Sequence, residues 1–182
     1  QHSINAIVDL TNYVLFELGQ PLHAFDAAVL NPNGQEITLE VRKATTNEQF
    51  VTLDDKNLVL PENTLVIANN GVAVALAGIK GGKNSGISET TSVIVLEAAN
   101  FNATTIRQTS NVLNLRTEAS ARFEKTLDPH LTELAVARFV ELAKKVWPNS
   151  SVVSAVVDVR NFNDKPFVLE FPVALISEGL GV

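Results

Sequence analysis

The chain has 182 residues, 46% of them apolar, and a formal net charge of -6, which indicates a folded protein with one large core or two small ones. It has no cysteine, so disulfides and thiolate metal sites are excluded, and His2, His23 and His130 are too scattered for a histidine zinc site. The acidic balance argues against a domain that holds nucleic acid by charge alone, and no apolar run approaches the ~20 residues of a membrane helix.

These features lead us to expect a soluble, cytoplasmic protein with no metal, no cofactor and no membrane partner. We also expect a segment of a longer protein. The chain has no methionine, starts at Gln1 and ends in ISEGLGV, where a helix has just begun.

The first predicted element is an amphipathic helix that Ser3 caps and that Gly19 and Pro21 end. Three polar residues interrupt its apolar face and form either a solvated surface or a pocket wall; they are Asp9, Thr11 and Asn12. The next segment, PLHAFD at 21–26, is predicted as a tight connector in which His23 and Asp26 share a hydrogen bond. A lone histidine in such a connector is more often structural than functional.

A lobe rich in β-strands is predicted next. Residues 36–44 alternate between polar and apolar side chains, as a half-exposed strand does, and shorter strands are expected at 50–53, 58–60 and 65–68. Asn70-Gly71 predicts a two-residue hairpin, because both positions of that turn need positive φ. GIKGGKNSG at 78–86 is either a turn or a loop whose N–H groups lie close to a ligand. It lacks the GK[ST] ending of a phosphate loop.

An apolar strand is predicted at 92–98, buried on both faces and ending at a single carboxylate, Glu97. A carboxylate in that position must be hydrogen-bonded, ion-paired or neutral, because an isolated buried charge is strongly disfavoured. Its partner is therefore either a nearby arginine, Arg116 or Arg122, or a polar ligand.

The second half of the chain reads mainly as helices. Asn102 caps a helix through Leu113, Asn114 ends it in a left-handed conformation, and residues 116–125 form a loop running into a short helical turn. Asp128-Pro129 opens the strongest helix, which Trp147-Pro148 closes. Further strands are predicted at 152–159 and 167–171, and a new unit at 172–182. This order predicts an α+β fold with mixed or antiparallel sheets and flanking helices.

Several of these segments together resemble the editing module of the beta subunit of bacterial phenylalanyl-tRNA synthetase. They are INAIVDLTNYVLFELGQPLHAFD, AGIKGG, VLEAANF and IRQTSNVLNLRTEASARFEKTLDP. The resemblance covers about residues 3–160 and departs from the family pattern at Asn114, where glycine is common, and at Lys125-Thr126. It implies the fold of that module over residues 1–163 and the start of the next domain at 164–182.

The resemblance also implies a function, the hydrolysis of tyrosine wrongly attached to phenylalanine tRNA. It places Glu97 at the substrate hydroxyl and Gly78, Gly81 and Ala119 in the substrate pocket. It gives His23, with Thr11 and Thr117, the task of orienting a water near the ester carbonyl. The parent enzyme would use ATP and magnesium and pair with an alpha subunit, whereas this segment would bind the acceptor end of the tRNA without a cofactor.

Two alternatives remain at this point. The chain could be a free-standing deacylase that clears mischarged tRNA. It could also be a non-catalytic module that holds synthetase subunits or tRNA.

Overall fold

Antiparallel pairing joins the strands of the computed structural model, which describes residues 5–34, 36–162 and 168–181. A four-stranded sheet has the order β2-β5-β6-β7, formed by Leu39–Lys43, Leu65–Asn69, Val72–Leu76 and Lys80–Gly81. Two ribbons pair β1 (Leu22–Asp26) with β8 (Ile94–Ala98) and β3 (Gln49–Val51) with β4 (Asn57–Val59). The predicted α+β class with antiparallel sheets and flanking helices is confirmed.

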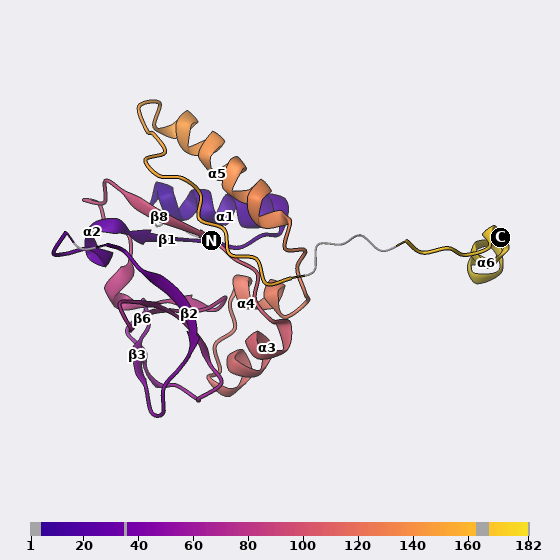
Figure 1. Cartoon of the computed structure of the whole chain (residues 1–182), viewed down its shortest axis with the longest axis horizontal. Coiled ribbons are helices and arrows are strands. Elements are labelled where there is room, and N and C mark those ends of the chain that lie inside the picture. Colours follow the sequence, from indigo (N-terminus) through magenta and orange to yellow (C-terminus); the bar gives the residue numbers. More distant parts are fainter. Residues whose placement is uncertain (1–4, 35, 163–167, 182) are drawn as a thin grey trace. The chain divides into compact units, whose positions relative to one another are not determined.

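Two long helices cover the β1–β8 ribbon. Helix α1 (Ala6–Leu18) packs beside α5 (Leu131–Val146), and Figure 1 shows both lying over β1 and β8. Val14, Ala135 and Phe139 are the buried centre of this layer. The ribbon is thereby held on one side, which leaves its other side available to the second core.

The larger core lies between the four-stranded sheet, the ribbon and the short helices α3 (Ala103–Val112) and α4 (Glu118–Phe123). Phe25 of β1 is fully buried in this core, whereas Leu22 of β1 packs against the layer of α1 and α5. Strand β1 therefore contributes to both cores. Other large buried side chains of the larger core include Leu30, Phe50, Val66, Leu76, Ile106 and Phe123. Two further short helical segments are α2 (Ala27–Leu30) and a 3-10 turn at Lys83–Ser85.

Local turn and cap chemistry follows the sequence at most positions. Asn70 and Gly71 have φ values of 49° and 80°, which confirms the hairpin between β5 and β6. The side chain of Asn102 accepts a hydrogen bond from the backbone N–H of Thr105, and Asn114 has a φ of 50°, so both predictions for α3 are confirmed. Gly19 ends α1 with a φ of 78°.

Two helix starts differ from the prediction. Asn5 caps α1 by accepting a hydrogen bond from Val8, whereas Ser3 lies outside the described residues. Helix α5 begins at Leu131 after His130, and the side chain of Asp128 accepts a hydrogen bond from the backbone of His130 in the turn that precedes it. Asp128-Pro129 therefore introduces the helix without forming its first turn.

The segment PLHAFD is a strand, and its prediction as a connector was wrong. Residues 22–26 pair along their whole length with β8. Asp26 does not bond to His23; its carboxylate accepts hydrogen bonds from the backbone of Ala28 at 2.8 Å and from the hydroxyl of Thr91 at 2.5 Å. Successive strand residues alternate faces, so positions 23 and 26 point to opposite sides.

Four strand predictions need correction. β2 starts at Leu39, and Val41 in it is exposed, so the expected apolar face is incomplete. β8 starts at Ile94 and is partly buried throughout, not buried on both faces. Residues 152–159 form no strand, since no strand pairs with them in the described part of the chain, and their valines are 62% to 90% exposed. Residues 168–171 are also irregular, and Phe167 lies outside the described residues.

The described chain divides into two compact units, residues 1–151 and 152–182. The second contains α6 (Val173–Leu180), which Gly181 ends with a φ of 70°. The domain boundary predicted between 163 and 164 falls in a range that the structure does not describe, and it stays a prediction. Within the described residues, every helix is too short or too polar to cross a membrane.

Candidate functional site

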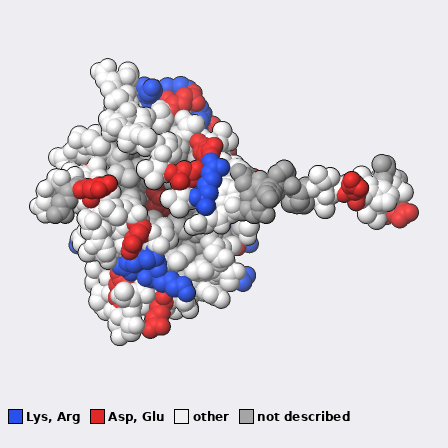
Figure 2. Space-filling view, viewed as in Figure 1, with Lys and Arg blue, Asp and Glu red and all other residues white. Residues whose placement is uncertain are grey.

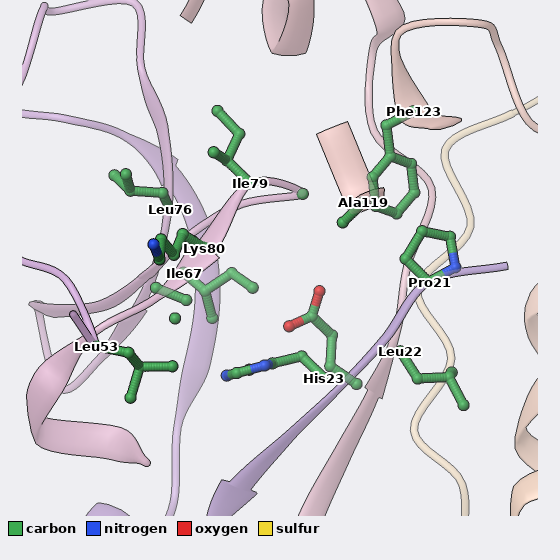
Figure 3. A pocket seen from close by; sticks show the side chains of 14 residues that line it. Pro21, Leu22, His23, Leu53, Ile67, Leu76, Ile79, Lys80, Ala119 and Phe123 are labelled. Carbon is green, nitrogen blue, oxygen red and sulfur yellow. The ribbon is translucent and has the colours of Figure 1, made fainter. Parts of the chain in front are cut away.

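A cavity of about 210 Å³ lies where β1, β8, β7 and α4 meet. Five of the seven site residues named from the sequence line it: His23, Gly78, Gly81, Glu97 and Ala119. Figure 3 shows the His23 side chain extending from β1 toward Leu53, with Pro21 and Leu22 on the other side. The remaining lining residues are Ile67, Ala75, Leu76, Ile79, Lys80 and Phe123.

The register of the ribbon brings His23 and Glu97 together. Their Cα atoms are direct partners across the antiparallel pair of β1 and β8, so the two side chains lie on the same face. Both residues line the same cavity. The ribbon therefore presents an imidazole and a carboxyl group side by side to whatever occupies this space.

The carboxyl group of Glu97 has no hydrogen bond or ion pair among the described residues. Arg116 bonds to Glu124 at 2.7 Å and Arg122 bonds to Glu118 at 2.6 Å, so the alternative of an arginine partner for Glu97 is wrong. Burial among apolar side chains raises the pKa of Glu97 to about 7. Near neutral pH this carboxyl group is consequently divided between its charged and neutral forms.

The imidazole of His23 is shielded from solvent on one edge. Burial lowers the pKa of His23 to about 4, so the ring is neutral at pH 7. Its Nε2 atom is buried and finds no hydrogen-bond partner among the described residues. The ring also stacks edge-on against Phe25, with ring centroids 4.5 Å apart. A buried polar atom without a partner is uncommon in folded proteins and marks a place where a water or ligand can bind.

The glycines of residues 78–82 allow close packing around the cavity. A Cβ atom at position 81 would lie 2.8 Å from Cε1 of His23, and one at position 82 would lie 2.6 Å from the carbonyl oxygen of Val74. Gly78 has a φ of 66°, and a Cβ there would lie 2.9 Å from the rings of Phe101 and Phe123. Glycine is therefore required by a backbone contact at 82 and by both contact and backbone conformation at 78, whereas a side chain at 81 would displace the His23 or Leu53 side chain.

Thr117 lies beside the cavity without lining it. Its hydroxyl donates to the carbonyl of Ile79 at 2.9 Å and accepts from the backbone N–H of Ser120, in a capping box at the start of α4. Ile79 and Ala119 are lining residues, so Thr117 joins two walls of the cavity.

Thr11 belongs to α1 and is also outside the lining. It is buried, and its hydroxyl donates to the carbonyl of Val8 one turn earlier in the same helix. The role in orienting water that the resemblance gives to Thr11 and Thr117 stays a prediction.

Replacing Thr117 with alanine should lower the free energy of unfolding by about 1–2 kcal/mol, because a helix cap and a hydrogen bond to another element are lost together. Urea unfolding measures this change. Thr132→Ala is the matched control, since the hydroxyl of Thr132 donates only to the carbonyl of Pro129 in its own turn. Equal losses in the two variants would mean that the bond from Thr117 to Ile79 adds no stability.

The sequence did not point to Leu53, Lys80 or Phe123 as site residues. Leu53 was expected to end a strand at 50–53, but it follows β3 in the turn at 52–56, so no local signal pointed to it as a site residue. Phe123 ends α4, one helical turn after Ala119, so it lies on the same face. Lys80 lines the cavity while its Nζ atom pairs with Asp54 at 2.8 Å.

Charges around the molecule are largely paired. Figure 2 shows Lys and Arg side chains next to Asp and Glu on the face in view, with no broad basic area. Arg42 bonds to Glu48 and Arg138 bonds to Glu17, each at 2.8 Å or less. Any contact of this face with a nucleic acid must accordingly be local.

The raised pKa of Glu97 predicts a pH-dependent stability. Folding favours the protonated carboxyl group. The stability that this group contributes is fully present below about pH 4.5 and is lost as the pH rises through about 7. Glu97→Gln cannot ionise. Between pH 4.5 and 8 the free energy of unfolding of this variant should therefore rise relative to that of the wild type by at most about 3.5 kcal/mol, at about 1.4 kcal/mol per pKa unit.

Urea unfolding of both proteins across this range is the measurement. The lowered pKa of His23 acts in both: stability is lost as the pH falls from 6.5 toward about 4, so this effect cancels in the comparison. A difference between the two proteins that stays constant with pH would show that Glu97 titrates normally.

Comparisons with known proteins agree with this architecture. The family model described as the B3/4 domain matches residues 1–147. The phenylalanine–tRNA ligase beta subunit of Solibacter usitatus is 46% identical over 178 residues, 98% of this chain and 23% of that protein. The beta subunits of Clostridium acetobutylicum and Geobacter sulfurreducens are 40% and 45% identical, over 98% and 99% of this chain and 22% of each relative.

The chain thus spans less than a quarter of the length of these relatives. The domain match covers the whole of the cavity, from Pro21 to Phe123. The chain belongs to the B3/4 domain family, and it corresponds to a segment of the phenylalanine–tRNA ligase beta subunit.

Proposed function

We propose that the cavity binds the side chain of tyrosine esterified to a tRNA and that the chain hydrolyses this ester. The observation that carries the proposal is the unpaired carboxyl group of Glu97, which faces His23 in a cavity otherwise lined mainly by apolar residues. Such a combination of apolar walls and a few convergent polar groups is typical of small-molecule sites.

The size of the cavity supports an aromatic occupant. A cavity of about 150 Å³ lined by apolar side chains can hold a benzene ring. The cavity here, at about 210 Å³, has room for a phenol. Leu53, Ile67 and Phe123 provide apolar contacts for the ring, and the glycines at 78 and 81 leave space that side chains would fill.

Glu97 provides the discrimination. A tyrosine hydroxyl would donate a hydrogen bond to this carboxyl group, whereas phenylalanine would leave it buried and unpaired. A site that binds a hydroxyl in this way rejects the analogue without it by roughly 10⁴. An aminoacylation site built for phenylalanine has to make the opposite selection. It discriminates against tyrosine only about a hundredfold, because a hydrophobic pocket cannot strongly reject an added hydroxyl. A hydrolytic site with this carboxyl group would supply the missing selectivity.

His23 is better suited to orienting a water molecule than to acting as a general base. With a pKa of about 4 it is a weak base at pH 7, since proton transfer is most effective when the pKa of the base lies near the working pH. A neutral imidazole can still accept or donate a hydrogen bond to a water placed near the ester carbonyl. Thr117 holds α4 to Ile79 in the glycine-rich segment 78–82. We keep Thr11 and Thr117 as residues that help His23 to orient the water.

The partners of the parent enzyme follow from the same proposal. The curated relatives are beta subunits of a phenylalanine–tRNA ligase, which supports a tRNA for phenylalanine as the carrier of the ester and an alpha subunit as the partner of the longer chain. ATP and magnesium would act in the ligase reaction elsewhere. The acidic net charge means that the acceptor end of the tRNA is held mainly by the amino acid in the cavity and by other parts of the enzyme.

The test compares hydrolysis of tyrosyl and phenylalanyl esters of phenylalanine tRNA by the wild-type chain. We expect hydrolysis of the tyrosyl ester at a rate well above that in buffer, and a rate for the phenylalanyl ester close to the buffer rate. Equal rates for both esters would refute selection by Glu97. Tyrosine-selective binding of the esters without hydrolysis would support the alternative of a non-catalytic tRNA-binding module.

A further inference from the structure

Gln20 has an unusual environment at the cavity end of the β1–β8 ribbon. It is fully buried, between Gly19 at the end of α1 and Pro21 at the edge of the cavity. Its side-chain Nε2 donates two hydrogen bonds, to the carbonyl of Pro21 at 3.0 Å and to the carbonyl of Ala99 at 2.9 Å. The Oε1 atom is buried without a partner among the described residues.

The two carbonyls belong to the next rung of the ribbon. Leu22 is the direct partner of Ala98, so Pro21 and Ala99 would form the pair after it. Proline has no N–H to donate, so the backbone ladder cannot continue at this position. The carboxamide of Gln20 donates to both carbonyls and so replaces the missing backbone bond.

Register decides whether the site exists. A shift of one residue between antiparallel strands moves every side chain of one strand to the opposite face relative to its partner. His23 would then lie opposite Leu96 or Ala98, and the imidazole and the carboxyl group would no longer share a cavity. The far end of the ribbon is held separately, through the bonds of Asp26 to Thr91 and Ala28.

We propose that Gln20 is a positioning residue, which fixes the end of the β1–β8 ladder and so keeps His23 opposite Glu97 in the cavity. Its effect on ester selectivity rests on the function proposed above. Its effect on the ribbon does not. Gln20 itself is not a lining residue and acts through the backbone of Pro21 and Ala99.

The test uses the chain with Gln20→Met, which keeps an unbranched side chain of similar length but removes both donors. Amide hydrogen exchange at residues 22–24 and 96–98 should become at least about tenfold faster, while exchange at Phe25 and Asp26 stays as in the wild type. The preference for the tyrosyl over the phenylalanyl ester should fall by at least about tenfold, because small displacements of reacting groups have large effects on rate.

Asn69→Leu is the matched control. The Nδ2 atom of Asn69 also donates to a backbone carbonyl, that of Leu30 at 2.7 Å, and its Oδ1 is also buried without a partner among the described residues. It lies in β5, outside the ribbon and outside the lining. This variant should lose global stability but keep the exchange pattern of the ribbon and the ester preference.

A second variant, Gln20→Glu, keeps the shape and, when protonated in this buried position, one donor. It should give exchange rates and an ester preference between those of wild type and Gln20→Met, which keeps the proposal testable if the methionine variant does not fold. Wild-type exchange at the cavity end in both variants would overturn the positioning role. If the wild-type chain shows no ester preference, the proposed function fails, but the exchange comparison still decides the role of Gln20.

Discussion

Replacing Glu97 with alanine should reduce the preference for the tyrosyl over the phenylalanyl ester by about a thousandfold. The carboxyl group has no protein partner among the described residues, so the substrate hydroxyl would be its hydrogen-bond donor. In its absence both side chains enter a mainly apolar cavity that has lost its carboxyl acceptor, and an added hydroxyl changes binding there only weakly. The ratio of kcat/KM for the two esters measures the loss directly.

Two further variants separate selectivity from general damage. Glu97→Gln keeps one acceptor oxygen, so it should lose the preference by only about tenfold. Glu48→Ala removes a carboxylate that is paired with Arg42 at 2.8 Å and lies outside the cavity lining, so it should lower stability and leave the ratio unchanged. An unchanged ratio in Glu97→Ala would mean that the hydroxyl is recognised by another group.

The reduced charge of His23 and Glu97 near pH 7 has a physical cause that limits what chemistry the site can perform. Apolar surroundings push the pKa of His23 down and that of Glu97 up, so both groups lose much of their charge near pH 7. An ion pair between them would need two charges in the same low-dielectric space. The cavity therefore suits recognition through hydrogen bonds and the positioning of water more than strong acid or base catalysis.

The fold was predictable where local signals decide it. Asn70-Gly71, Asn102 and Asn114 each specify a turn or cap by their own side chain or backbone preference, and all three predictions are confirmed. The strand at 22–26 was not recognised, because it is short, follows a proline and has its partner at 94–98, far along the sequence. The valine-rich run at 152–159 predicted a strand that has no partner in the described chain, and a strand cannot form alone.

The site was predictable only in part. The resemblance named His23 and Glu97 separately, but the fact that they face each other depends on the register of two distant strands, which local patterns do not contain. Leu53 and Lys80 reach the cavity through a turn and a short edge strand, whose positions depend on tertiary packing. Thr11 and Thr117 were named with the others, yet their hydroxyls bond to backbone carbonyls nearby.

Replacing Gly81 with alanine should reduce hydrolysis of the tyrosyl ester by about a hundredfold, because the new methyl group would displace the imidazole of His23. It would lie 2.8 Å from Cε1 and 3.0 Å from Nε2 of His23, and 2.8 Å from Cδ1 of Leu53. Gly81→Trp should abolish hydrolysis by filling the cavity. Gly86→Ala is the matched control, since its methyl group would meet only Leu53, at 2.9 Å, and it should retain activity within about threefold. Circular dichroism checks the fold of each variant. A Gly81→Ala protein that is folded and fully active would place the hydrolytic site away from His23.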